Sequence, residues 1–323
     1  MVLTVTINPL LENRIELTTL PIGKVSRGTK REFKAGGKGV NVSRQLDYLS
    51  VKNTALLFLG GSNGKRLRKV MIDENINFTS ISCKGETRGA TLAIEKSKNR
   101  VTSIFEPSNE ISENEINDFK VKLSKMIQNC SIVVFSGSVP NKEAASIITY
   151  GIELANKFNK TSILDTYGEH LQECINAKPT LLHNNIDELE NSFNIKLNNE
   201  PSKVAFLKEL YNKGVKLAFI TNGAKPTYAN KFGFIYKISS LKIKAIDATG
   251  SGDAFIAGIA YGLERALVFD EFVKVATALG SVNATKWDVC TIKLDEIQNI
   301  VDSITVKTIG KKFKLINDSP THS

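Results

Sequence analysis

The sequence predicts an α/β protein in which a mainly parallel sheet lies between layers of helices. From about residue 54 onward, short apolar and β-branched runs alternate with segments of helical periodicity. This alternation favours parallel strands joined by helices that cover both faces of the sheet. The first third of the chain differs, because two runs of alternating polarity follow each other near residues 88–105 without a helix between them. We therefore expect a second, smaller β-sheet.

The elements of the main sheet follow from this rhythm. Strands are expected at residues 55–59, 131–135, 162–165, 180–183 and 217–221, and helices at 63–75, 113–128, 142–159 and 203–213. Parallel sheets carry their sites at the carboxyl ends of strands. Polar residues at or just after such ends are expected to share one cleft: Asp165, Asn185, Thr221 and Asp247.

The smaller sheet is expected from four runs of alternating polarity. These runs are residues 14–19, 29–34, 88–95 and 101–105, and Asn99 and its neighbours make the hairpin turn between the last two. The alternative is that these strands extend the edge of the main sheet.

Composition limits the classes of function. The chain has 323 residues, 41% hydrophobic and 24% charged, which is typical of a globular protein. No apolar run is long enough to span a membrane and no leader pattern precedes the first strand, so we expect a cytoplasmic protein. The four scattered cysteines predict free thiols.

The net charge of +10 suits the binding of an anionic substrate, or it reflects only a lysine-rich surface without a function. The lysines are dispersed along the sequence, which argues against nucleic acid binding. Residues 307–314, the most basic segment, are expected to form a solvated tail.

The segment Asp247–Phe255 is the most informative motif. It follows a β-type run, residues 236–246, and leads into an apolar segment of helical periodicity. Glycines at such a turn let backbone N–H groups approach a ligand, and the helix N-terminus favours an anion. Asp253 lies inside this predicted anion cradle, where a carboxylate can accept a proton from an attacking hydroxyl. The alternative is that Asp253 only caps the helix.

A second glycine-rich motif, Ala35–Arg44, also lies between a β-like run and a helix. Its three glycines allow a flat loop against a polar ligand, and Lys38 and Asn41 supply donors. Arg44 is expected to be an exposed helix residue. The motif has neither the dinucleotide-binding nor the P-loop spacing.

With three further segments, in the same order, these motifs resemble the ribokinase-like, or pfkB, family of carbohydrate kinases. The further segments are Thr4–Pro9, Ser136–Pro140 and Asn185–Glu188. The resemblance implies a ribokinase-like three-layer α/β/α fold, with residues 1–323 as one kinase domain. It also implies that segments near 10–36 and 86–106 form a β-lid, which would exclude water from the reaction.

The resemblance implies roles for residues at the nucleotide end, with ATP and Mg²⁺ as cofactors. Asp253 would be the general base, and the N–H groups of Gly250, Ser251 and Gly252 would stabilise the transferred phosphoryl group. Asn185 and Glu188 would organise Mg²⁺ and its waters, with Glu188 acting indirectly. Three residues would flank the nucleotide: Thr221, Gly223 and Asn283.

At the acceptor end, the resemblance implies contacts to the sugar and to a phosphate that it already carries. Glu12, where the family usually has Asp, and Gly37, Lys38 and Asn41 would contact the sugar. Arg88 would grip the phosphate, and Arg27 is a second candidate. Either arginine could instead be an exposed lid residue.

The implied activity is ATP-dependent phosphorylation of a ketohexose phosphate to a bisphosphate, of the tagatose-6-phosphate kinase or 1-phosphofructokinase type. The chain departs from the family at His183-Asn184, where Lys-Pro is usual, and at residues 285–291, which lack the usual glycine. Asp247 is more typical of ribokinase and could hold K⁺. The alternatives are therefore a ribokinase- or nucleoside-kinase-type enzyme, or a non-catalytic sugar-phosphate-binding regulator. A homodimer through the lid is possible.

Overall fold

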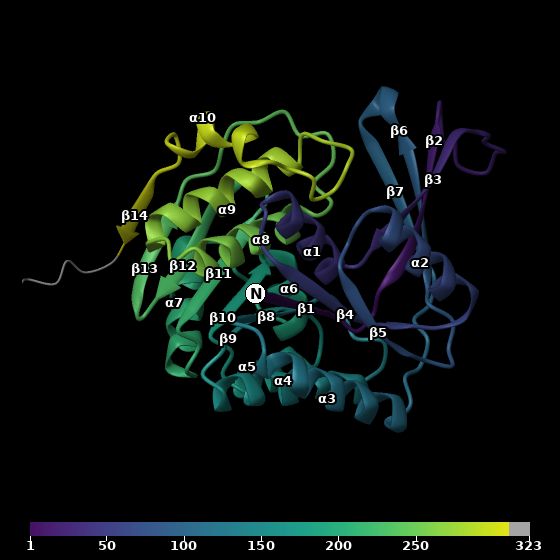
Figure 1. Cartoon of the computed structure of the whole chain (residues 1–323). Helices are drawn as coiled ribbons and strands as arrows, with labels where there is room; N and C mark the ends of the chain where they lie inside the picture. Colours follow the sequence, from purple (N-terminus) through teal and green to yellow (C-terminus); the bar gives the residue numbers. More distant parts are fainter. Residues whose placement is uncertain (310–323) are drawn as a thin grey trace, which may run out of the picture.

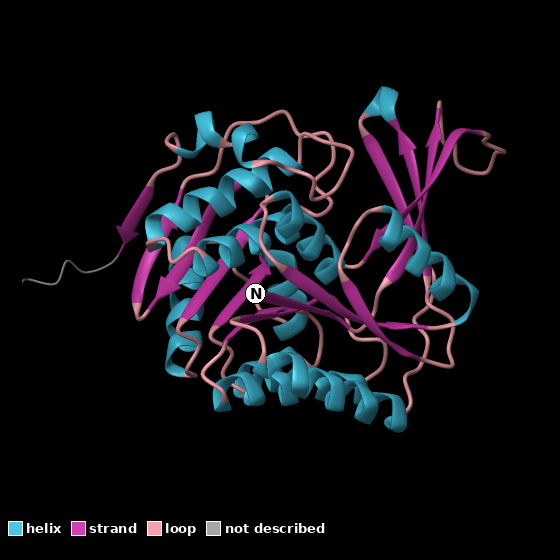
Figure 2. Ribbon diagram, viewed as in Figure 1, coloured by secondary structure: helices cyan, strands magenta, loops and turns pink. Residues whose placement is uncertain are grey.

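The computed structural model describes residues 1–309 and has the predicted α/β architecture, with a ten-stranded main sheet and a separate four-stranded sheet (Figures 1 and 2). The main sheet runs in the order β14 (Val306–Ile309), β13 (Phe234–Ile238), β12 (Lys225–Lys231), β11 (Leu217–Asn222), β10 (Leu181–Asn185), β9 (Thr161–Asp165), β8 (Ile132–Ser136), β1 (Val2–Thr6), β4 (Asn53–Leu59) and β5 (Phe78–Ser82). From β11 to β5 the neighbouring strands are parallel, whereas β12, β13 and β14 join antiparallel. The prediction of a mainly parallel sheet is confirmed.

Helices cover both faces of this sheet (Figure 1). One layer consists of α1 (Lys38–Tyr48), α8 (Ser251–Glu264), α9 (Phe269–Asn283) and α10 (Gln298–Val301). The opposite layer consists of α3 (Glu113–Gln128), α4 (Ser146–Lys157), α5 (Leu171–Asn176), α6 (Ile186–Phe193) and α7 (Glu200–Asn212). In β8, Val133 and Phe135 belong to the core of the second layer, and Ile132 and Val134 to that of the first. Alternate strand residues thus build two cores.

Local sequence explains why α3 begins and where it packs. The Ser112 hydroxyl accepts from the Glu115 N–H, and the Glu115 carboxylate accepts from the Ser112 N–H, which forms a capping box. A buried stripe at helical spacing, which includes Ile116, Phe119 and Leu123, faces the sheet. The helix spans the predicted residues 113–128.

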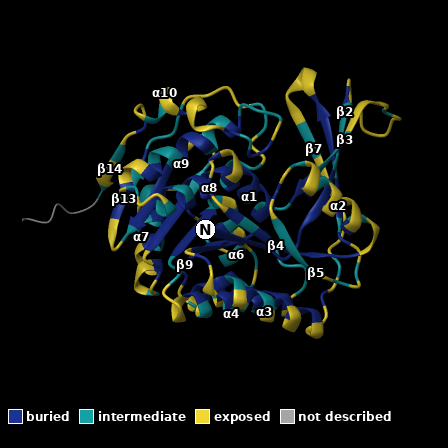
Figure 3. Ribbon diagram, viewed as in Figure 1, coloured by how far each residue is buried: buried dark blue, intermediate teal, exposed yellow. Residues whose placement is uncertain are grey.

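The smaller sheet is separate from the main sheet, so the edge-extension alternative is wrong. It contains, in spatial order, β3 (Gly28–Gly36), β2 (Leu10–Leu17), β6 (Gly89–Glu95) and β7 (Arg100–Phe105). Asn99 turns the β6–β7 hairpin in a left-handed conformation (φ 47°), after a 3₁₀ helix at Lys96–Lys98. We call this sheet the lid. Its loop at residues 18–27 is largely exposed, and α2 (Gly61–Asp73) packs beside its base (Figure 3).

Three sequence-based expectations about local structure are wrong. The run at 236–246 continues as a strand only to Ile238, and residues 239–250 form a loop whose Ile246 and Asp247 N–H groups both donate to the Ala284 carbonyl. Arg44 is buried rather than exposed, because it pairs with Glu74, the residue that caps the C-terminus of α2. Lys307 lies in edge strand β14 and not in a tail, whereas residues 310–314 lie outside the described part.

The remaining elements follow the predicted order, with the helix expected at 142–159 divided into a 3₁₀ turn (Glu143–Ala145) and α4. A further 3₁₀ turn, Leu294–Glu296, precedes α10. Within residues 1–309, no helix has the length and apolar character needed to cross a membrane.

Candidate active site

A cavity of about 640 Å³ opens at the carboxyl ends of the central strands, between the main sheet and the lid. Strand β1 lies between β4 and β8, so the chain builds the sheet outward in both directions from this point. Such a switch in strand order leaves a crevice where ligands bind in α/β proteins. One end, which the sequence predicts to bind the acceptor and which we call the acceptor end, is lined by residues after β1, β3 and β8. The other, predicted to bind the nucleotide and called the nucleotide end, is lined by residues after β10 and β11 and by the loop that precedes α8.

The turn before α8 is built to receive an anion. Gly250 has a φ of 76°, and a Cβ there would meet Val289 Cγ1 at 2.1 Å, so only glycine fits. The Ser251 N–H donates to the Ala248 carbonyl and closes the turn. The N–H groups of Gly250, Gly252 and Asp253 then have no protein acceptor among residues 1–309. Three free donors at the start of a 14-residue helix favour a phosphate oxygen. The Ser251 N–H, which was also expected to face the ligand, is already used by the turn, although Ser251 lines the cavity.

Asp253 lies in the first turn of α8, is 3% exposed and still lines the cavity. Burial raises its pKa to about 7, and nearby Asp165 and Glu188 add to this, while Lys38 and the hydrogen bond from Asn41 act in the opposite direction. A carboxyl group with a pKa near neutrality can accept a proton and release it again, which suits a general base.

A chain of hydrogen bonds fixes the position of the Asp253 carboxylate. Asn41 Nδ2 donates to Asp253 Oδ2 at 2.7 Å, and Arg44 Nη1 donates to Asn41 Oδ1 at 2.8 Å. Arg44 in turn bonds Glu74 Oε2 through Nε at 2.9 Å and through Nη2 at 2.7 Å. The buried arginine is therefore the second support of the carboxylate, not the exposed residue that the sequence predicted.

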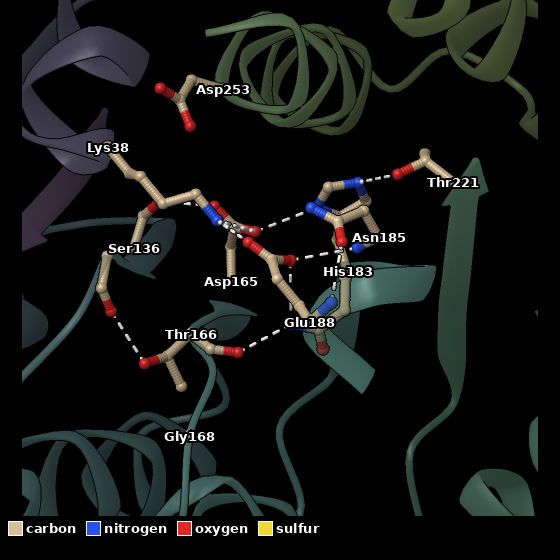
Figure 4. Close-up of polar contacts among 12 residues, drawn as sticks. Lys38, Ser136, Asp165, Thr166, Gly168, His183, Asn185, Glu188, Thr221 and Asp253 are labelled. Carbon is tan, nitrogen blue, oxygen red and sulfur yellow. Dashed lines mark hydrogen bonds and ion pairs between the residues drawn. The ribbon is translucent and has the colours of Figure 1, made fainter. Parts of the chain in front are cut away.

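Lys38 lines the cavity and extends toward Asp165 and Glu188 (Figure 4). Its Nζ is 3.2 Å from Asp165 Oδ1 and 2.9 Å from Glu188 Oε1. Burial alone would lower the pKa of Lys38, but the carboxylates of Asp165, Glu188 and Asp253 outweigh it and raise that pKa. A charged lysine at this point neutralises part of the acidic cluster and is available to a phosphoryl group.

Asp165 is the centre of a buried polar network beneath Lys38 (Figure 4). It accepts from His183 Nδ1 at 2.9 Å and from Ser136 Oγ at 2.6 Å, in addition to Lys38. Burial would raise its pKa, but Lys38, His183 and Ser136 together hold it below the ordinary value. His183 Nε2 lies 3.2 Å from Thr221 Oγ1, so the network reaches the nucleotide end of the cavity.

Asn185 and Glu188 form the capping box of α6, the structural role that sequence alone could not separate from metal binding. Glu188 N donates to Asn185 Oδ1 at 2.8 Å, and Asn185 N donates to Glu188 Oε2 at 3.0 Å. Both residues line the cavity. Their hard oxygen atoms fit Mg²⁺ that retains waters, and the buried Asn184 Oδ1 beside them lacks a partner among the described residues. No cluster of three or more His, Cys, Asp or Glu suited to a metal occurs in residues 1–309, so such an ion would rely on water and phosphate.

Arg88 enters the cavity at the acceptor end as a cation without a carboxylate partner. Its Nη2 donates to the Asn8 carbonyl at 3.2 Å and to Ser138 Oγ at 3.4 Å, and its guanidinium lies 5.8 Å from the Phe105 ring centroid. Burial lowers its pKa, and its buried Nε has no acceptor in the described chain. A half-buried arginine without a charged partner among the described residues favours an anionic ligand in the cavity.

The remaining predicted acceptor residues also reach the cavity. Gly37, with a φ of 112°, would place a Cβ 2.9 Å from the Thr6 side chain, so the chain needs glycine there. Glu12 is buried and accepts from Arg14 Nε at 2.9 Å, while Arg14 Nη1 donates to the Trp287 carbonyl at 2.8 Å. The longer carboxylate of Glu12 is therefore held by the lid.

Three predicted site residues do not line the cavity. Arg27 is exposed on the loop at residues 18–27. Asn283 is 1% exposed, donates to the Thr249 carbonyl and accepts from Cys290 N, so it braces the anion turn. Asp247 Oδ1 accepts from Thr249 N at 3.0 Å and from Thr249 Oγ1 at 2.7 Å, so Asp247 has a local hydrogen-bonding role in the turn. Thr221 and Gly223 do line the cavity.

Sequence reasoning assigned no role to Tyr167, Ser138 or Asn8, which all line the cavity. It placed His183 only at the end of a strand or in a loop and did not predict its contacts with Asp165 and Thr221. The position of Tyr167 just after β9 was a usable signal, because side chains that follow parallel strands reach the site.

Comparison with known proteins agrees with this geometry. The sequence model of the pfkB family carbohydrate kinases matches residues 11–295. Tagatose-6-phosphate kinases from two Staphylococcus epidermidis strains are 31% identical over 310 residues, covering 95% of this chain and 99% of theirs. A possible 1-phosphofructokinase of Thermotoga maritima has a TM-score of 0.88 at 23% identity, covering 96% of this chain and 100% of that one. Phosphofructokinase-2 of Escherichia coli, in a complex with potassium, has a TM-score of 0.86 at 22% identity, covering 94% and 98%. The two solved structures support the fold.

Proposed function

Because the chain belongs to the pfkB family of carbohydrate kinases, it is an ATP-dependent phosphotransferase, and we propose that it phosphorylates a ketohexose phosphate to a bisphosphate. The activity would be of the tagatose-6-phosphate kinase or 1-phosphofructokinase type. The tagatose-6-phosphate kinases, at 31% identity, support this substrate class.

One observation carries the proposal: Arg88 and Asp253 line the same cavity at positions with opposite electrostatic demands. Arg88 lacks a carboxylate partner among the described residues, so an acceptor that brings a phosphate would complete its surroundings. Asp253 needs a hydroxyl whose proton it can take. A ketose with a phosphate at one end and a free hydroxyl at the other meets both demands.

The catalytic step follows from the side chains around the free hydroxyl. Asp253 would accept the proton of this hydroxyl as its oxygen attacks the terminal phosphorus of ATP. The bond between that phosphorus and the leaving ADP would break. The free N–H groups of Gly250, Gly252 and Asp253 would stabilise the charge on the transferred group. Lys38 would leave part of its contact with Glu188 to meet the same charge. The lid would exclude water, the competing acceptor.

The nucleotide end suits ATP with Mg²⁺. Apolar side chains of the loop at residues 239–250, among them Leu241 and Ile243, line the cavity with Thr221 and Gly223 and would receive the base. Asn185 and Glu188 would hold waters of Mg²⁺, which neutralises phosphate charge when bound.

Two further expectations belong to this proposal. No described residue bonds Asp247 Oδ2, which would be a ligand for K⁺. Escherichia coli phosphofructokinase-2 has been crystallised with potassium and in a tetrameric inhibited form. For this chain we propose a homodimer in which exposed lid residues such as Ile104 and Phe105 are covered.

The test is an ATPase-coupled assay across ketohexose phosphates, the corresponding free ketohexoses, ribose and nucleosides. We expect turnover with a ketohexose phosphate at much higher kcat/KM than with any unphosphorylated acceptor. Preference for ribose or a nucleoside would replace the proposal with the ribokinase- or nucleoside-kinase-type activity. Binding of a sugar phosphate without turnover of any acceptor would support the regulator alternative and contradict the proposal.

A further inference from the structure

Tyr167 is the large side chain of the cavity for which the proposed reaction has no use. It follows β9 at the mouth of the cavity, and 39% of it is exposed. It belongs to neither hydrophobic core, and its hydroxyl has no hydrogen-bond partner among the described residues. Packing therefore does not explain its presence.

The residues beside Tyr167 hold its backbone firmly. The Thr166 hydroxyl donates to the Gly137 carbonyl at 2.7 Å, and the Thr166 carbonyl accepts from Asn184 Nδ2 at 2.7 Å. On the other side, Gly168 N donates to Ser192 Oγ at 2.8 Å, and Gly168 has a φ of 105°. An exposed phenol on so constrained a backbone is already positioned for a ligand, which limits the entropy lost on binding.

The order of strands leaves two directions for Tyr167, since β9 lies between β8 at the acceptor end and β10 at the nucleotide end. Two observations favour the acceptor end, where the sequence places Lys38 against the sugar. The Lys38 Nζ lies 5.4 Å from the centroid of the Tyr167 ring. Tyr167 also lies close enough to Arg88 to act against the lowering of the Arg88 pKa by burial.

We propose that Tyr167 is a specificity-determining residue whose phenol O–H donates a hydrogen bond to the phosphate that the acceptor already carries. It would act beside the guanidinium of Arg88, while its ring supports Lys38. The Ser138 hydroxyl, which accepts from Arg88 and from Asn8 Nδ2 at 3.0 Å, borders the same position. The inference rests on the proposed function, because it needs an acceptor with a phosphate.

Tyr167→Phe tests the hydroxyl alone, because the ring that faces Lys38 stays. A hydrogen bond to a charged group is strong, so we expect KM for the ketohexose phosphate, and its Kd by calorimetry without nucleotide, to rise about tenfold. KM for ATP should stay unchanged, and so should kcat/KM for the corresponding unphosphorylated ketohexose. Tyr211→Phe is the matched control, since Tyr211 is similarly exposed (41%) on α7 and does not line the cavity.

The outcomes separate this inference from the proposed function. If Arg88→Ala removes the preference of the enzyme for phosphorylated acceptors and Tyr167→Phe leaves it intact, the role of Tyr167 is wrong and the proposed function stands. Equal losses with phosphorylated and free ketohexose would also overturn the inference, because the hydroxyl would then contact the sugar. If the wild-type enzyme shows no preference for phosphorylated acceptors, both proposals fail.

Discussion

The two ends of the cavity treat charge in opposite ways. Around Asp253 and Lys38, each charged side chain belongs to a network that already contains its partners, with Lys38 between two carboxylates and Asp253 bonded by Asn41. At the acceptor end, Arg88 has only neutral oxygen atoms for partners, and the Tyr167 hydroxyl has none among the described residues. The charged side chains around Asp253 thus have partners before a ligand arrives and the anion turn leaves only neutral backbone donors free, whereas Arg88 has no charged partner among the described residues. On the proposed function, the difference teaches that the catalytic side chains are preorganised, whereas recognition of the acceptor uses a charged group left without a charged partner.

The end around Asp253 is tested most directly by Asp253→Asn. The amide keeps the size of the side chain but cannot take a proton, so we expect kcat to fall by at least about a hundredfold. ATP affinity should change little, as measured by calorimetry. Asp118→Asn, on the exposed face of α3, is the control for the same chemical change. Near-normal turnover would remove Asp253 from the mechanism.

The acceptor end is tested by Arg88→Ala against Arg27→Ala. Loss of a charged hydrogen-bonded contact costs roughly 1.5–3 kcal/mol, so KM for the phosphosugar should rise about tenfold to a hundredfold in the first variant. KM for ATP should change much less. Arg27 is exposed and does not line the cavity, so its loss should leave both KM values unchanged. Equal effects of the two substitutions would show that the phosphate is not bound by Arg88.

The pH dependence of the reaction tests the role of Asp253 in a second way. The pKa of Asp253 is raised to about 7, so the base becomes protonated as the pH falls through that value. We expect kcat/KM to decrease about tenfold per pH unit below about 7 and to be level above it, until another group titrates. The residual activity of Asp253→Asn should lack this decrease. A wild-type profile that stays flat down to pH 5 would contradict the assignment.

The smallest expected effect is that of K⁺ at Asp247. A cation near the anion turn would strengthen the field on the transferred phosphoryl group, and we expect at most about a tenfold gain in activity over matched tetramethylammonium buffer. Asp247→Asn should reduce the gain. Equal rates in the two buffers would mean that Asp247 serves only its hydrogen bonds to Thr249.

Much of the fold was predictable because it depends on local patterns. The capping box at Ser112 and the apolar stripe of α3 fixed residues 113–128 without reference to the rest of the chain. The strand predicted from the run at 236–246 was wrong beyond Ile238 for a physical reason. Its alternating Leu241, Ile243 and Ala245 are apolar because they line the cavity, a pattern that mimics a half-buried strand.

The site was predictable to the extent that its residues lie in motifs. Glycine at 250 and the carboxylate at 253 are fixed by a turn, and the structure places both at the cavity. The partners of these residues come from distant segments. Arg44 is buried only because Glu74 approaches from α2, and Asn283 faces the anion turn because α9 packs on α8. Single-sequence spacing contains no information about such long-range contacts.

The contact between Arg44 and Asn41 has a consequence for the amide beside the base. A carboxamide has two nearly isosteric orientations, and only one presents its NH₂ group to a carboxylate. The Arg44 guanidinium can only donate hydrogen bonds, so it bonds the amide oxygen of Asn41 and not the NH₂ group. This contact selects the orientation in which the NH₂ group faces the carboxylate. Glu74, at the C-terminus of α2, holds the guanidinium and so determines, from outside the cavity, which face of Asn41 the base meets.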